Sequence, residues 1–255
     1  MTAAAQEANH PAAPGAAPPA LAPAVGTTRR FMGEQERLLN YLHQLGGLIS
    51  VTILHVRGPL TMERARAALA YLQARHPMLA AHVRRRRLGW RRRLPFIVVE
   101  PELVMEGTLP IPLREGRGDW REGVRREGRH PLPRFSRLPR ARAVLYPPAE
   151  DGIARLLLTM DHAIGDAPAV ALAVRDFMAF LADPTLSAVP GGLPPALESR
   201  YKKSGREDGD YLPAIRVPTR RVRGAKRTTE ADWRRLTREE TAALRAAARA
   251  HATTM

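Results

Sequence analysis

The stretch that decides the fold is IARLLLTMDHAIGDAPAVALAVRDFMAFLADP, residues 153–184. It opens with an apolar run, broken only by Arg155, whose length suits a buried strand of a sheet. It closes with apolar residues at helical spacing from Val170 to Leu181, which predict a helix packed into a core. The junction between the two, residues 161–166, carries a histidine and two carboxylates. Because rigid elements on both sides would fix these side chains, the junction is a candidate site for chemistry.

An ordinary structural junction fits the same pattern. In that interpretation Asp166 caps the helix that follows, and His162 is hydrogen-bonded within the core. The spacing alone does not separate this arrangement from a functional site.

The letters DHAIGDA at 161–167 resemble the HHxxxDG motif of the condensation-domain and chloramphenicol-acetyltransferase-like acyltransferase superfamily. His162 matches the second, catalytic histidine of that motif, and Asp166 matches its aspartate. Asp161 replaces the first histidine, and Ala167 replaces the glycine. Within the superfamily the pattern is most similar to polyketide-associated acyltransferases and stand-alone condensation domains.

Three further landmarks occur in the order that the resemblance implies. MGEQE at 32–36 resembles the opening of the family, GPL at 58–60 its first strand-to-helix turn, and RHP at 75–77 the segment after its first helix. The implied fold is an α/β (α+β), chloramphenicol acetyltransferase-like subdomain. It would contain a mixed, mostly antiparallel sheet with helices packed on it.

The local patterns predict the other elements of this fold. Helices are expected at 34–45, 61–75, 120–127 and 237–251, and strands at 50–56, 79–87, 90–99, 109–113 and 141–146. The first helix should bury its stripe of Leu38, Leu42 and Leu45. The arginine-rich strands around Gly89 should form a hairpin, whose tip is either a solvated end or a contact for an anionic partner. The short link at 147–152 makes the last strand antiparallel to the motif strand.

The domain organisation is predicted from composition and from the resemblance. Residues 1–28 are rich in alanine and proline and are expected to be a disordered tail without a secretory signal. Residues 29–184 form the N-terminal subdomain, and 185–226 resemble the crossover to a second one. Residues 227–255 would begin that second subdomain, which we expect to be truncated, because the final ATTM resembles the HGTT that leads into its next helix.

Charge and composition limit the function classes. The net charge is +16, and all but three of the 41 basic residues are arginine, which fits either a compositional bias or an acidic partner. The absence of cysteine excludes disulfides and thiol nucleophiles. No apolar run approaches the roughly 20 residues that span a bilayer, and a cytoplasmic protein is expected. His162 and Asp166 lack clustered partners, so no metal is expected.

The resemblance implies acyl transfer from a thioester to a hydroxyl or amine, in lipid or secondary-metabolite biosynthesis. His162 would be the general base, and Asp166 would be structural and tied to an arginine. Asp161 would either favour the protonated form of His162 or satisfy a backbone group. No cofactor would be permanently bound. An acyl-CoA or a phosphopantetheine-linked acyl thioester would be the co-substrate.

Three function classes therefore remain open. The first is an acyltransferase served by acyl-CoA or by an acidic acyl carrier protein. The second is an inactive or partner-dependent half-domain, completed by a second subdomain or by self-association. The third, a nucleic-acid binder, is disfavoured because no recognised nucleic-acid-binding motif accompanies the positive charge.

Overall fold

The computed structural model describes residues 27–45, 48–87, 99–133, 135–196, 198–201 and 236–251. Residues 1–26 of the predicted tail, the tip of the arginine hairpin and most of the predicted crossover therefore lie outside the described residues. Within the described residues, no helix has both the length and the apolar character needed to cross a membrane.

The main sheet has four strands in the order β2-β7-β6-β5. Their bounds are Ile49–Arg57 for β2, Leu113–Glu115 for β5, Ala141–Tyr146 for β6 and Ile153–Asp161 for β7. The β2–β7 and β6–β7 pairs are antiparallel and the β5–β6 pair is parallel, which confirms a mixed, mostly antiparallel sheet. β5 begins later than the predicted strand at 109–113, because Pro110 and Pro112 have no N–H to donate to a ladder.

The motif strand β7 lies between β2 and β6, and side chains pack against both of its faces. Ala154, Leu156 and Leu158 point into the larger core cluster. Leu157 points to the opposite face, where it packs with Val144 of β6. This alternation explains why the sequence of β7 is apolar almost throughout rather than at every second position.

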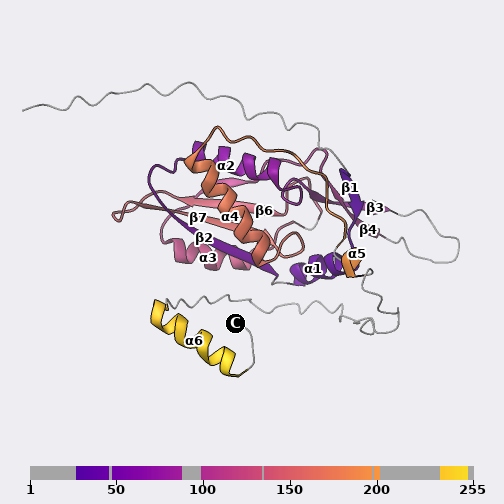
Figure 1. Ribbon diagram of the computed structural model, residues 1–255. Helices are drawn as coiled ribbons and strands as arrows, with labels where there is room; N and C mark the ends of the chain where they lie inside the picture. Colours follow the sequence, from indigo (N-terminus) through magenta and orange to yellow (C-terminus); the bar gives the residue numbers. More distant parts are fainter. Residues whose placement is uncertain are drawn as a thin grey trace, which may run out of the picture.

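Helices cover both faces of the sheet (Figure 1). α2 (Met62–Arg75) and α4 (Ala167–Ala182) pack side by side on one face, where the Tyr71 and Phe180 rings stack at 4.8 Å. α3 (Trp120–Arg129) covers the other face. As predicted, Thr61 caps α2, and its side chain accepts a hydrogen bond from the Arg64 N–H.

A second sheet of three antiparallel strands has the order β1-β4-β3. The bounds are Arg29–Phe31 for β1, His82–Arg87 for β3 and Val99–Val104 for β4. The arginine-rich β3 was predicted. Of its predicted partner strand at 90–99, only residue 99 lies within the described residues, and the partner strand β4 continues from there to Val104. The buried carboxylate of Glu102 on β4 accepts from Arg84 at 2.7 Å, so the arginine strand pairs with a strand that supplies a counter-charge.

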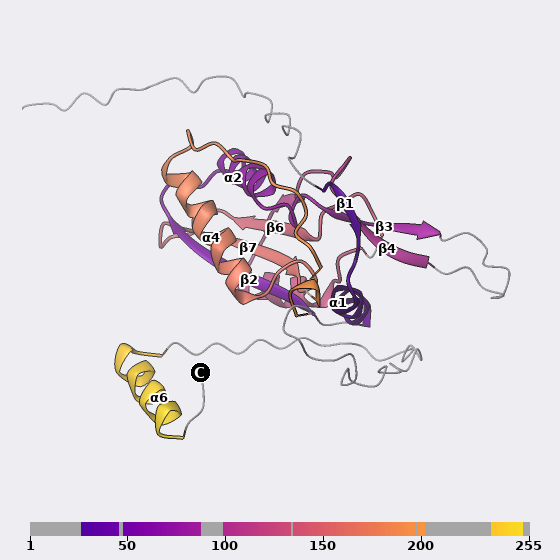
Figure 2. The same ribbon diagram turned by 45° about the vertical axis from the view of Figure 1, so that its right-hand side comes forward.

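α1 (Glu34–Leu45) lies beside β1 and presents an unexpected face to the interior (Figure 2). Its buried residues are Glu36, Asn40 and His43. The prediction that the leucine stripe is buried is wrong for Leu38, which is 38% exposed. A buried arginine and a buried aspartate lie next to this helix, so its polar face is the one that finds partners.

After α4 the chain runs back to β1. The Leu193 N–H donates to the Thr27 carbonyl at 2.8 Å, and the Pro194 carbonyl accepts from Arg30. The short helix α5 (Glu198–Tyr201) follows.

The helix α6 (Arg238–Ala250) carries the predicted capping box between Thr237 and Glu240. None of its residues is buried, and Leu244 on its expected apolar side is 47% exposed.

Candidate functional site

His162 lies in the turn between the end of β7 and the start of α4. Its main-chain N–H donates to the Leu48 carbonyl at 3.1 Å, which ties the turn to the residue before β2. Its side chain is exposed, and within the described residues its imidazole has no hydrogen-bond partner. The interpretation that His162 is hydrogen-bonded in the core is therefore wrong. The imidazole is available to an incoming group.

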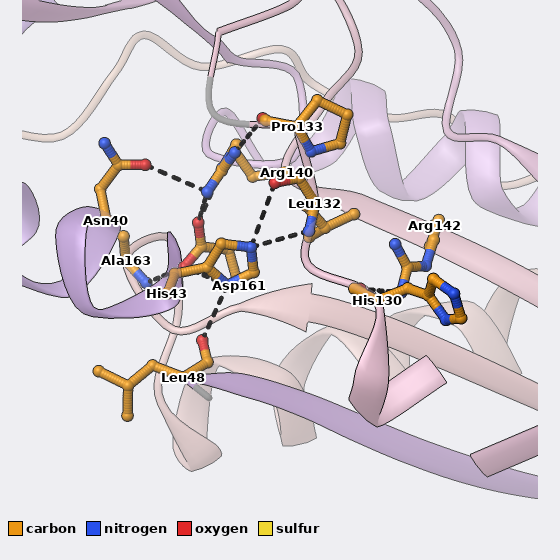
Figure 3. Close-up of polar contacts among 10 residues, drawn as sticks. All are labelled: Asn40, His43, Leu48, His130, Leu132, Pro133, Arg140, Arg142, Asp161 and Ala163. Atoms are coloured by element: carbon orange, nitrogen blue, oxygen red, sulfur yellow. Dashed lines mark hydrogen bonds and ion pairs between the residues drawn. The ribbon is translucent and has the colours of Figure 1, made fainter. Parts of the chain in front are cut away.

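Asp161, immediately before His162, is fully buried and anchors the end of β7 (Figure 3). Its Oδ2 accepts from the Arg140 guanidinium, with Nε at 2.7 Å, and its Oδ1 accepts the Ala163 N–H at 3.0 Å. Of the two roles left open for Asp161, the structure thus shows a satisfied backbone group, together with an ion pair that the sequence did not indicate.

The guanidinium of Arg140 also makes hydrogen bonds to two further residues. It donates to the Asn40 side-chain oxygen at 3.1 Å and to the Pro133 carbonyl. Its side chain is 1% exposed. A buried guanidinium normally requires a counter-ion and hydrogen-bond acceptors, and each of the three guanidinium nitrogens of Arg140 donates at least one hydrogen bond.

His43 of α1 completes this buried cluster, and the sequence did not single it out. Its Nε2 accepts the Leu132 N–H at 2.8 Å, while its Nδ1 faces the Leu48 carbonyl at 3.4 Å and Asp161 Oδ1 at 3.8 Å. Burial lowers the pKa of His43 below its ordinary value, and the opposing effect of Asp161 is smaller. The available signal was the i, i+4, i+7 spacing of the polar residues Glu36, Asn40 and His43.

Asp166 has the capping role that the ordinary-junction interpretation gave it, and not the ion pair that the resemblance implied. It is the N-cap of α4, and its Oδ1 accepts the Ala169 N–H at 3.0 Å. Among the described residues it forms no ion pair; the carboxylate of this turn that pairs with an arginine, Arg140, is Asp161. A short strand-to-helix turn requires a cap, and Asp166 has the φ, ψ and side chain of one.

Two of the sequence landmarks gain a physical explanation. Arg75 and His76 at the end of α2 both contact the Asp176 carboxylate of α4, at 2.7 and 3.1 Å, and so join the two helices. In the opening segment, Glu36 accepts the Gly33 N–H at 2.8 Å and pairs with Arg30, which fixes the start of α1. Both landmarks therefore maintain the fold around the site.

Of the three predicted site residues, the structure exposes His162 and buries Asp161 beneath it. Asp166 is exposed at the start of α4. The part of the chain that the structure describes contains no group of three histidine, cysteine or acidic side chains that could hold a metal ion. The site therefore has one accessible imidazole, on a turn that hydrogen bonds to the Leu48 carbonyl and the buried Asp161 carboxylate hold in place.

No family model and no curated sequence matches this chain. Among solved structures it is similar to the X-domain from teicoplanin biosynthesis, with a TM-score of 0.51, 20% identity and 75% of this chain covered. It is also similar to the first condensation domain of the calcium-dependent antibiotic synthetase, with a TM-score of 0.51, 18% identity and 70% covered. Polyketide synthase associated protein 5 from Mycobacterium tuberculosis gives a TM-score of 0.50, 16% identity and 71% covered.

These similarities show a condensation-domain-like fold, as the sequence motif implied. The chain spans less than half the length of each of these structures, namely 42%, 45% and 40%. At such low identity the similarity establishes the fold, and the activity has to be argued from the site.

Proposed function

We propose that this protein takes part in acyl transfer from a thioester to a hydroxyl or amine, with His162 as the general base. The observation that carries the proposal is the exposed imidazole of His162 on a turn fixed by main-chain hydrogen bonds to Leu48 and Asp161. A catalytic group has to be both accessible and held in place, and His162 meets both conditions.

In the proposed reaction, the neutral imidazole takes the proton from the acceptor as its oxygen or nitrogen attacks the thioester carbonyl. The tetrahedral intermediate then collapses with cleavage of the carbon–sulfur bond. The imidazolium returns its proton to the departing thiolate, so the histidine is regenerated and no acyl-enzyme forms. The co-substrate is an acyl-CoA or an acyl group on phosphopantetheine.

The start of α4 provides few donors for the oxyanion of this intermediate. Pro168 has no N–H, and the N–H groups of Ala169 and Val170 are already donated to Asp166. At this helix end that leaves Ala167 to stabilise the developing charge through its N–H. Further donors would come from a second subdomain or a partner chain.

A partner-dependent half-domain is the second candidate. The observation that favours it is the share of the similar structures' length that this chain spans. The chain spans less than half of the condensation-domain-like structures that it resembles. In this version, the remaining walls of the site come from a second subdomain, from a second copy of the chain, or from an acidic carrier protein attracted by the positive charge. His162 keeps the same role in the completed site.

The test measures thiol release from a panel of acyl-CoA thioesters with hydroxyl and amine acceptors. The protein has no cysteine, so a thiol reagent reports only the product. Replacing His162 by alanine should lower the rate by about 10²–10⁴-fold, the usual contribution of a general base. His251→Ala, at an exposed histidine next to α6, is the matched control and should retain the parent rate. Equal rates for His162→Ala and the parent would contradict the assignment.

A further inference from the structure

The two consecutive main-chain N–H groups around the candidate base are both held by acceptors that His43 faces. The His162 N–H donates to the Leu48 carbonyl at 3.1 Å, and the Ala163 N–H donates to Asp161 Oδ1 at 3.0 Å. The Nδ1 of His43 lies 3.4 Å from the first of these oxygens and 3.8 Å from the second. One buried imidazole nitrogen therefore lies between the two anchors of the His162 turn (Figure 3).

The other ring nitrogen determines the tautomer of His43. Its Nε2 lies 2.8 Å from the Leu132 main-chain nitrogen and 3.3 Å from the Leu132 carbonyl oxygen. The N–H contact is the shorter, and a ring nitrogen that accepts this N–H carries no proton in the neutral ring. The proton then resides on Nδ1, where it points toward the Leu48 carbonyl and the Asp161 carboxylate. Complete burial of the side chain favours this neutral form over an imidazolium.

We propose that His43 is a positioning residue for His162. Its Nδ1–H orients the Leu48 carbonyl and Asp161 Oδ1, and these in turn hold the N–H groups of His162 and Ala163. α1 thereby fixes the turn that carries the base from its buried side, through His43. This inference rests on the proposed function only for its effect on rate, because the positioning itself is a property of the main chain.

The first measurement requires no variant and no activity. The ¹⁵N chemical shifts of the His43 ring in the parent protein at pH 7 report which nitrogen is protonated. The proposal requires a neutral ring with the proton on Nδ1. A proton on Nε2, or an imidazolium, would overturn it whatever the protein catalyses.

Two conservative variants separate the two ends of the ring. Asparagine places its amide nitrogen near the position of Nδ1, and glutamine places its amide group near the position of Nε2. His43→Asn should therefore keep the donor toward Leu48 and Asp161, whereas His43→Gln should keep only the contact with the Leu132 N–H. His76→Leu is a matched control, because His76 is a half-buried histidine that contacts Asp176 away from the turn.

The readout is hydrogen exchange of the His162 and Ala163 amides, measured on samples shown to be folded by circular dichroism. We expect faster exchange at both amides in His43→Gln, and parent-like exchange in His43→Asn and His76→Leu. If thioester turnover is detected, kcat should fall by up to about 10²-fold in His43→Gln, with KM little changed.

A purely structural role for His43 would instead lower stability equally in both variants, with the two amides exchanging as in the parent. That result would overturn the proposal. Parent protein that shows the expected exchange pattern but no turnover would contradict the proposed function alone.

Discussion

Arg140 and Asp161 form an ion pair in which the side chains are only 1% and 0% exposed. The pair joins the start of β6 to the end of β7, directly before the exposed His162. A carboxylate thus occupies the first position of the HHxxxDG-like motif, where it anchors the turn from the interior. The contribution of this ion pair to the free energy of unfolding can be measured.

Asp161→Asn should destabilise the protein by about 3–5 kcal/mol, because it leaves the buried Arg140 without a counter-charge. Urea denaturation gives the change in the free energy of unfolding. Asp151→Asn is the control, since Asp151 pairs with Arg155 at the surface and should cause a much smaller loss. The double variant Asp161→Leu with Arg140→Met should recover much of the stability, because apolar residues of similar volume often replace a buried pair without loss. A loss from Asp161→Asn no larger than that from Asp151→Asn would contradict the prediction.

Asp166 is the N-cap of α4, and this role predicts that two substitutions at position 166 differ in their effect on stability. Asp166→Ala removes the acceptor of the Ala169 N–H and should cost about 0.5–2 kcal/mol, whereas Asp166→Ser keeps a capping oxygen and should be nearly neutral. Thermal unfolding followed by circular dichroism measures both. An equal loss in the two variants would indicate that the negative charge matters, as in an ion pair, and not the cap.

Most of the fold was predictable because local patterns determine it. The apolar run of β7, the caps at Thr61 and Thr237, and the short β6–β7 link each specify an element within a few residues, and the structure has all of them. The motif also identified the condensation-domain-like fold, because its landmarks occur in order along the chain.

The parts that were missed depend on partners distant in sequence. The polar face of α1 is buried because Asn40 meets Arg140, which is 100 residues away. No periodicity in α1 alone reveals that contact, and the apolar stripe that includes Leu38 is a strong but misleading signal. For the same reason, an ion pair with an arginine was expected at Asp166 but is found at Asp161. The motif singled out His162, which the structure exposes on the turn, and its catalytic role stays a prediction.

The buried and half-buried histidines predict how stability depends on pH. Burial lowers the pKa of His43, His76 and His82 below 6.5. As pH falls below about 7, the unfolded chain therefore takes up protons at these residues before the folded protein does, and the free energy of unfolding decreases. Urea midpoints from pH 8 to pH 5 should fall steadily through this window. His43→Asn should reduce the slope, and a flat profile in the parent would contradict the prediction.

A second loss of stability should occur at lower pH and involve Glu127 of α3. Burial acts to raise the pKa of Glu127, but hydrogen bonds from Arg142 and Arg114 outweigh it and hold this pKa below 4.5. The stabilisation is therefore present above about pH 4.5 and is lost as pH falls through the lower pKa of the folded state. Burial likewise acts to raise the pKa of Asp176 but its arginine partners lower it overall, so Glu127→Gln should reduce the acid loss in the urea midpoints without abolishing it. An unchanged acid profile in that variant would contradict the assignment.

The contact between α3 and β6 predicts that a glycine is required at position 123. A Cβ added to Gly123 would collide with the hydroxyl of Tyr146 and lie 2.7 Å from its ring Cζ. Alanine favours a helix over glycine by about 1 kcal/mol. Overpacking a buried contact costs about 1–3 kcal/mol, so Gly123→Ala should be destabilising overall.

The Tyr146 hydroxyl is buried with no hydrogen-bond partner within the described residues, so Tyr146→Phe should be neutral or stabilising. Because Tyr146→Phe also removes the colliding atom, the double variant should lose less stability than Gly123→Ala alone in thermal unfolding. Strictly additive effects would show that the two residues do not collide.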